Sequence, residues 1–127
     1  DDFVKKANVK KILLSSGKVY YDLKKYREEN KIEDTAIIRI EQYYPYPKSE
    51  LEEVLKAYAN EVKLVWVQEE PANMGAMAFM KIRLNEKTIG KKQIEFVSRK
   101  SSPSPAPGSY KIWAETQKKI IEKAFEN

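Results

Sequence analysis

Two adjacent carboxylates, Glu69 and Glu70, follow an apolar run and precede a proline and a glycine. Paired carboxylates can act as acid and base when their surroundings separate their pKa values. Neighbouring residues in an extended segment point to opposite faces, however, so these two side chains are not expected to converge on one substrate. The pair therefore predicts a structural or interface role, and no catalytic residue is assigned.

The side chains used most often in zinc sites and in general base catalysis are missing from the chain. It contains no histidine and no cysteine. Most zinc chemistry and histidine-based proton transfer are thereby excluded, and no metal site is predicted. The absence of disulfides suits a reducing compartment.

Several residues near the carboxylates could hold an anion or a partner protein. Asn73 and Gly75 stand where a helix should begin, so their N–H groups could meet an anion, although ordinary helix initiation explains them as well. Arg99 could clamp a phosphate or form an interdomain ion pair. Tyr44 and Tyr46 could stack on an adenine ring, but tyrosine is also enriched at protein interfaces.

Composition indicates a globular chain that binds neither nucleic acid nor membrane. Of its 127 residues, 42% are hydrophobic and 34% are charged, and 24 basic against 19 acidic residues give a net charge of +5. The lysine pairs are spread along the chain and match no nucleic-acid-binding motif, so a solvated lysine-rich surface is expected. No apolar run is long enough to cross a bilayer.

Hydrophobic periodicity predicts a strand followed by a helix four times over. This alternation implies a largely parallel sheet with helices on both faces. Serine, glycine, proline and tyrosine are concentrated in the segments that follow the strands, which gather at one edge of a parallel sheet. The predicted strands are 9–15, 35–41, 62–67 and 93–98, and the predicted helices are 18–30, from Ser49 onward, from Met74 or Gly75 to 87, and 110–126.

Four motifs in order carry a resemblance to a known family. They are 15–21 (SSGKVYY), 39–47 (RIEQYYPYP), 68–76 (QEEPANMGA) and the serine- and proline-rich segment before Gly108-Ser109. Together they resemble the C-terminal domain of the thiamine diphosphate-dependent decarboxylating component of the 2-oxoglutarate dehydrogenase complex. The resemblance covers nearly the whole chain, from Val9 to Phe125.

This resemblance implies a transketolase-like C-terminal domain, a three-layer αβα sandwich with a mostly parallel sheet. The parent enzyme would be a homodimer in the bacterial cytoplasm or mitochondrial matrix that binds thiamine diphosphate and magnesium in its preceding domains. It would decarboxylate 2-oxoglutarate in the tricarboxylic acid cycle and pass the succinyl group to a lipoyl succinyltransferase. The present chain would carry neither cofactor and would serve assembly or regulation. The resemblance does not separate 2-oxoglutarate from 2-oxoadipate.

Some relatives bind an activating acetyl-CoA through a glutamine that corresponds to Gln42 and two arginines after the Pro-x-Pro. Here Gln42 and Lys48 are kept, but Ser49 and Glu50 replace the arginines. Acetyl-CoA activation is therefore not expected, because a phosphate ligand would lose two cations. The residues assigned to a regulatory nucleotide site or an interface are Gln42, Tyr44, Tyr46, Lys48, Glu69, Glu70, Asn73, Gly75 and Arg99.

The expected organisation is a linker over residues 1–8 and one domain over 9–127. The chain begins at Asp1 without a methionine, as though cut from a longer polypeptide. The alternative is a free-standing flavodoxin-like module that binds a nucleotide at the same edge. The size of the native polypeptide would decide between the two.

Overall fold

The computed structural model describes residues 3–41, 47–59, 61–84, 94–100 and 110–126. Four strands in this part of the chain form one sheet, and each is followed by a helix, as the periodicity predicted. The bounds are η1 (Lys6–Asn8), β1 (Lys11–Ser15), α1 (Val19–Glu29), β2 (Thr35–Arg39), α2 (Lys48–Lys56), β3 (Lys63–Pro71), α3 (Met77–Leu84), β4 (Ile94–Arg99) and α4 (Tyr110–Phe125).

The sheet is parallel throughout the described strands, in the order β2-β1-β3-β4. In register, Leu13 of β1 lies between Ile37 of β2 and Val65 of β3. Parallel sheets need cover on both faces, which explains why β1 is buried at every position. Its continuous apolar run is the sequence signature of a doubly covered strand.

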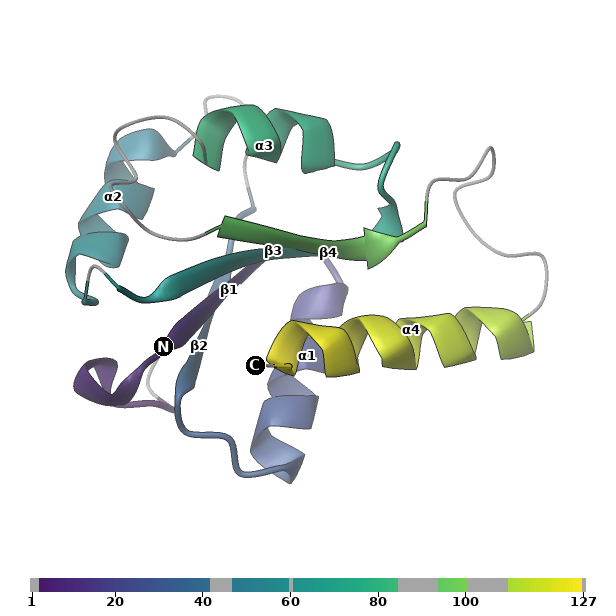
Figure 1. Cartoon of the computed structure of the whole chain (residues 1–127), viewed down its shortest axis with the longest axis horizontal. Helices are drawn as coiled ribbons and strands as arrows, with labels where there is room; N and C mark the ends of the chain where they lie inside the picture. Colours follow the sequence, from purple (N-terminus) through teal and green to yellow (C-terminus); the bar gives the residue numbers. More distant parts are fainter. Residues whose placement is uncertain (1–2, 42–46, 60, 85–93, 101–109, 127) are drawn as a thin grey trace.

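Two helices cover each face of the sheet (Figure 1). On the side of α2 and α3, Ile12, Leu14 and Trp66 belong to one core cluster. On the side of α1 and α4, Leu13, Val65 and Val67 belong to the other. Alternate residues of a strand face opposite sides, so one apolar run supplies both clusters. The predicted three-layer αβα sandwich is confirmed.

Two helices differ in detail from the prediction. Ser49 and Glu52 have capping-box spacing, but α2 begins at Lys48 after Pro47 and has no side-chain cap. Proline can precede the first turn without losing a needed N–H, so the serine lies inside the helix. Apolar periodicity predicts buried helix faces that include Val54 on α2 and Ile82 on α3, but these side chains are 44% and 68% exposed. Ile82 lies five residues beyond Met77, which places it on the opposite side of α3.

Two strands extend further than predicted. β3 reaches Pro71 instead of ending at Val67, and β4 reaches Arg99. The polar residues beyond Val67 remain extended because their pairing with β4 resumes after an irregularity, with Pro71 opposite Arg99. The residues expected in loops at this edge therefore lie partly on strands.

The segment predicted as a linker contributes to the core. Val4 is 8% exposed and packs in the cluster beneath α2 and α3. The Arg27 guanidinium lies 4.5 Å from the centre of the Phe3 ring. Arg27 is itself buried and donates a hydrogen bond to the Thr35 carbonyl, at 3.2 Å.

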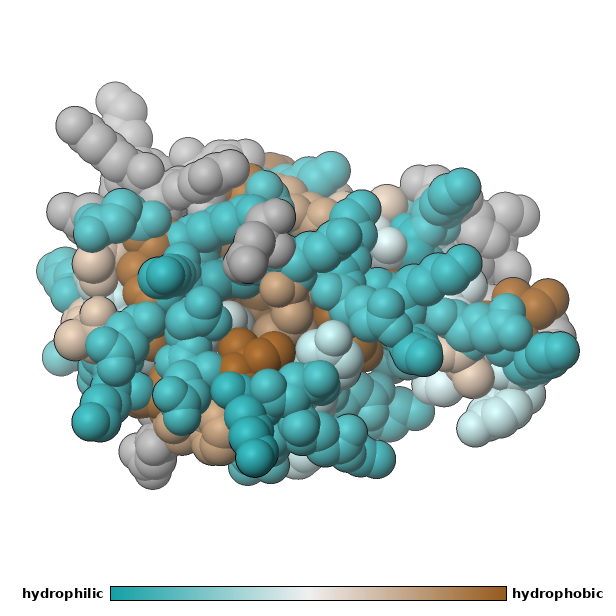
Figure 2. Space-filling view, turned by 60° about the horizontal axis from the view of Figure 1, so that its bottom comes forward, coloured by the Kyte–Doolittle hydropathy of each residue, from teal (hydrophilic) through white to brown (hydrophobic). Residues whose placement is uncertain are grey.

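The α1–α4 side of the molecule is mainly hydrophilic, with separate hydrophobic areas (Figure 2). Among the described helices, none has the length and apolar character needed to cross a membrane.

Candidate functional site

The unusual residues meet at one end of the sheet, which we call the carboxyl-end edge: Ser15 to Gly17, Gln68 to Gly75, Arg99, and the first turns of α1 and α4. Parallel strands bring their carboxyl ends together, and ligands and partners are met there in open α/β sheets. Gly17 has a φ of +73°, which allows the sharp turn between β1 and α1. Sequence and topology thus place these segments side by side.

Gln68 organises the loop after β3. Its side chain is 3% exposed, and its Oε1 accepts a hydrogen bond from Trp66 Nε1 at 3.0 Å. Its Nε2 donates to the carbonyls of Pro71 and Met74, both at 2.9 Å. One buried amide therefore satisfies a buried indole and the Met74 carbonyl, and it shares the Pro71 carbonyl with the backbone N–H of Met74.

Glu69 and Arg99 form a second network on the α4 face. Arg99 Nε donates to the Glu69 carbonyl at 2.7 Å, and one of its terminal nitrogens donates to Gln117 Oε1 at 2.8 Å. Gln117 Nε2 in turn donates to Glu69 Oε2 at 3.0 Å and to Asp22 Oδ2 at 3.1 Å. A single buried glutamine on α4 thus joins β3, β4 and α1.

Arg99 is a buried cation without a direct ion pair in the described part of the chain. Burial lowers the pKa of its guanidinium, and the negative charge of Glu69 works in the opposite direction. The Arg99 guanidinium lies 5.5 Å from the Trp113 ring centre, and Lys18 Nζ lies 5.4 Å from it. Aromatic faces attract cations, so Trp113 links the two charges to the start of α4.

Glu70 points to the other face of the sheet. A Cβ placed on Gly75 would come within 3.2 Å of Glu70 Cβ, so the side chain packs directly against the glycine. Glu70 also lines a cavity of about 400 Å³ with Ser16, Gly17, Phe79 and parts of Trp66 and Gln68. The prediction that Glu69 and Glu70 lie on opposite faces is confirmed.

The structure brings together some of the predicted residues but not all. Glu69 and Arg99 share the α4-side network, while Glu70 and Gly75 share the cavity on the α3 side. Asn73 is exposed in the turn before α3, and that helix begins at Met77, two or three residues later than the expected Met74 or Gly75. Gln42, Tyr44 and Tyr46 lie outside the described residues. For Lys48 only its position at the start of α2 is described.

Sequence reasoning missed Gln117, which has the central place in the α4-side network. Its signal is its position four residues after Trp113, because residues four apart share a helix face. Asp22, which accepts from Gln117, was also missed, because hydrophobic periodicity identifies the apolar face of a helix and says nothing about its polar residues. Gln68 belongs to the third motif, but the sequence contains no signal for its side-chain hydrogen bonds with Trp66, Pro71 and Met74.

The side chains at this edge are of types that form non-covalent contacts with another molecule. Among the described residues, no group of three or more histidine, cysteine, aspartate or glutamate side chains could hold a metal ion. Hydrogen-bonded carboxylates, a buried guanidinium and exposed aromatic side chains are suited to contact with another molecule. Tyr110 is 82% exposed and Ile112 52% exposed on the first turn of α4.

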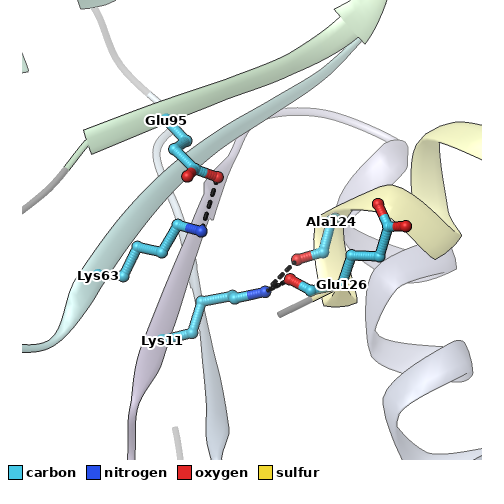
Figure 3. A network of polar contacts seen from close by, with 5 residues as sticks. All are labelled: Lys11, Lys63, Glu95, Ala124 and Glu126. Atoms are coloured by element: carbon cyan, nitrogen blue, oxygen red, sulfur yellow. Dashed lines mark hydrogen bonds and ion pairs between the residues drawn. The ribbon is translucent and has the colours of Figure 1, made fainter.

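The opposite, amino-end edge contains a different polar cluster (Figure 3). Lys11 is 6% exposed, and its Nζ donates to the carbonyls of Ala124, at 3.2 Å, and Glu126. Lys63 forms an ion pair with Glu95 at 2.7 Å. Lysine satisfies carbonyls that a helix leaves unpaired at its end, so Lys11 fastens the last turn of α4 to β1.

The described elements define a parallel α/β domain with helices on both faces of its sheet. The chain belongs to the family described as 2-oxoglutarate dehydrogenase C-terminal, which it matches over residues 1–125. The resemblance found in the four motifs is thereby confirmed.

Similar proteins are named as dehydrogenase components. The chain is 41% identical over 119 residues to a 2-oxoglutarate dehydrogenase E1 component of Cupriavidus necator, covering 94% of this chain and 12% of that protein. It is 41% identical over 120 residues to the E1 component of Azotobacter vinelandii, covering 92% and 13%. An E1/E2 component of Corynebacterium glutamicum is 39% identical over 120 residues, covering 94% and 10%. The chain thus spans about an eighth or less of the length of these relatives.

Proposed function

We propose that this chain is the C-terminal assembly domain of a 2-oxoglutarate dehydrogenase E1 enzyme. The observation that carries the proposal is the 94% coverage of the chain at 41% identity to a protein named as that component. The enzyme would use thiamine diphosphate and magnesium held by its other domains, decarboxylate 2-oxoglutarate and transfer the succinyl group to the lipoyl succinyltransferase. It would work in the bacterial cytoplasm or the mitochondrial matrix.

In this proposal the domain contributes no catalytic residue and docks through its carboxyl-end edge. Tyr110 and Ile112 offer exposed apolar surface beside the buried cation Arg99. Interfaces are enriched in tyrosine and arginine, so this composition suits contact with the preceding domains or the homodimer mate. Activation by acetyl-CoA is not part of the proposal, because Ser49 and Glu50, both exposed at the start of α2, supply no cation.

The test is to replace exposed apolar residues in the complete E1 enzyme. Tyr110→Ser combined with Ile112→Ser should shift the sedimentation profile from dimer toward monomer and reduce carbon dioxide release from 2-oxoglutarate. Because both side chains are exposed, the melting temperature of the domain should change little. A matched control is Ile82→Ser, which alters an exposed apolar residue on α3 away from this edge.

Two results would overturn the proposal. The first is a complete enzyme that does not decarboxylate 2-oxoglutarate. The second is a Tyr110/Ile112 double variant with an unchanged dimer and full activity. Equal loss in the Ile82→Ser control would also contradict docking at the carboxyl-end edge.

A further inference from the structure

The cavity on the α3 side of the carboxyl-end edge has one charged group among its described lining residues. That group is the carboxylate of Glu70, a half-buried residue whose side chain has no hydrogen-bond or ion-pair partner in the described part of the chain, although its backbone carbonyl accepts from Gln68. Other half-buried or buried acids and bases at this edge are engaged: Glu69 accepts from Gln117, and Arg99 donates to Glu69 and Gln117. Glu70 is thus an unused acceptor that faces a cavity.

The position of the Glu70 carboxylate is fixed by its surroundings. Gly75, with a φ of +67°, lets its backbone pass close enough for Glu70 Cδ and Oε1 to lie 3.2 Å from where a Cβ would stand. Gln68 in turn holds the carbonyls of Pro71 and Met74 and so fixes the loop that contains both residues. A carboxylate fixed in this way loses little conformational freedom when a partner binds.

The remaining walls suit a flat cation. Phe79 contributes a half-buried ring, and the guanidinium of Arg83 already lies 5.1 Å from its centre, outside the residues that line the cavity. This contact demonstrates that the ring accepts a guanidinium at that distance. Ser16, which is half-buried, adds a hydroxyl group to the lining.

Charge and size together disfavour a nucleotide in this cavity. A volume of about 400 Å³ is at the small end of the range for ligand pockets. A phosphate would meet the carboxylate of Glu70, while the described lining residues offer no cation to offset the repulsion. A single guanidinium could form paired hydrogen bonds with the carboxylate and stack on an aromatic wall.

We propose that this cavity receives an arginine side chain from the protein surface on which the carboxyl-end edge docks. Glu70 accepts its hydrogen bonds, and Phe79 contacts the plane of the guanidinium. The identity of the occupant as a protein side chain rests on the proposed docking function. The choice of a cation over an anion rests on the cavity alone.

The test uses the 127-residue chain and small probes, monitored by amide resonances in NMR titrations at constant ionic strength. Arginine amide should shift the resonances of Ser16, Gly17 and Gly75 in a saturable way at millimolar concentrations. Citrulline amide, which has a similar shape and no charge, should bind about tenfold more weakly or worse, because its neutral urea N–H groups are weaker donors and form no ion pair with the carboxylate. AMP should cause no saturable shift of these resonances.

Variants locate the effect. Glu70→Gln keeps the size of the side chain and should weaken arginine amide binding about tenfold or more. Glu53→Gln, an exposed position on α2 that does not line the cavity, should leave binding unchanged. Unchanged dispersion of the NMR spectrum will show that each variant is folded.

The inference is overturned if arginine amide fails to saturate, if citrulline amide binds equally well, or if AMP binds at these residues. If the NMR titrations give any of these results but the Tyr110/Ile112 double variant still dissociates the enzyme, the cation site is wrong and the docking function is retained. Conversely, arginine amide binding together with an unaffected dimer would overturn the docking function and keep only the cation site.

Discussion

The two ends of the sheet use buried polar groups in different ways. At the amino end, Lys11 fastens the last turn of α4, and Lys63 pairs with Glu95. At the carboxyl end, Gln68 and Gln117 hold loop carbonyls and carboxylates in place, while Glu70 faces a cavity without a partner in the described part of the chain. The first arrangement closes the fold, and the second fixes a surface that another molecule can use.

The difference follows from the chain path. Lys11 begins β1 at the end of the sheet where α4 finishes, so its side chain can reach the last carbonyls of that helix. Strand-to-helix connections at the carboxyl end leave carbonyls outside the ladder, and buried amides must satisfy them. Substitutions at the two ends should therefore change the stability of the domain by different amounts.

The largest effect is expected for Gln68→Leu. The substitution leaves the Trp66 indole N–H and the Met74 carbonyl without this partner, while the Pro71 carbonyl keeps only the backbone N–H of Met74. We expect the free energy of unfolding to fall by about 3 kcal/mol, since each buried unsatisfied group costs about 1–3 kcal/mol and such costs are not fully additive. Urea denaturation measures it, and a loss below about 1 kcal/mol would show that the amide does not organise the loop.

A smaller effect is expected for Gly75→Ala, with Gly17→Ala as its matched control. Both glycines have positive φ, +67° and +73°, but only a Cβ at Gly75 would press on Glu70. Backbone strain should cost each variant about 1 kcal/mol, and the contact should add about 1 kcal/mol at Gly75 alone. Thermal and urea unfolding of the pair measure the difference. Equal losses would mean that Glu70 moves aside freely.

The smallest effect is expected for Lys11→Met, within about 1 kcal/mol at neutral pH, because the lost hydrogen bonds are offset by relief of a buried charge. Burial and then Lys63 lower the pKa of Lys11, against the attraction of nearby acids including Glu95 and Glu126. Between that lowered pKa and the ordinary lysine pKa, the unfolded chain binds more protons than the folded chain, so stability from this group rises with pH.

The measurement is urea unfolding of both proteins across the alkaline range. The stability of the wild-type chain relative to Lys11→Met should increase as the pH rises through that window. Taking the difference removes Tyr58, whose pKa is raised by burial and which has the opposite pH dependence in both proteins. A flat difference would mean that Lys11 is not desolvated in the folded state.

Much of the fold could be predicted from particular residues. The run Ile12-Leu13-Leu14 indicated a strand covered on both faces, and each residue is fully buried. Alternation of strands with helices implied parallel pairing, and the four motifs pointed to the family that the whole-chain match confirms. The opposite orientation of Glu69 and Glu70 followed from strand geometry alone.

Other features depended on contacts between distant residues. Periodicity placed Val54 and Ile82 on buried faces because it cannot tell how far a neighbouring layer extends over a helix. The ends of β3 and β4 were set by the renewed pairing of Pro71 with Arg99, which no local signal contains. Gln117 is central to the α4-side network because it donates hydrogen bonds to both Glu69 and Asp22. These residues lie 48 and 95 positions away along the chain, so no local pattern could reveal the contacts.

Residue types and their spacing were enough to predict the layers, the parallel pairing of the strands, the family and the absence of histidine and cysteine chemistry. All of these depend on local properties of the chain. The three-dimensional packing was needed to see that Glu69 is engaged with α4 while Glu70 faces a cavity, and that Lys11 holds the end of α4 at the opposite edge. Such outcomes are fixed by packing between segments far apart in sequence, where the position of each polar atom relative to its partner decides whether it is satisfied.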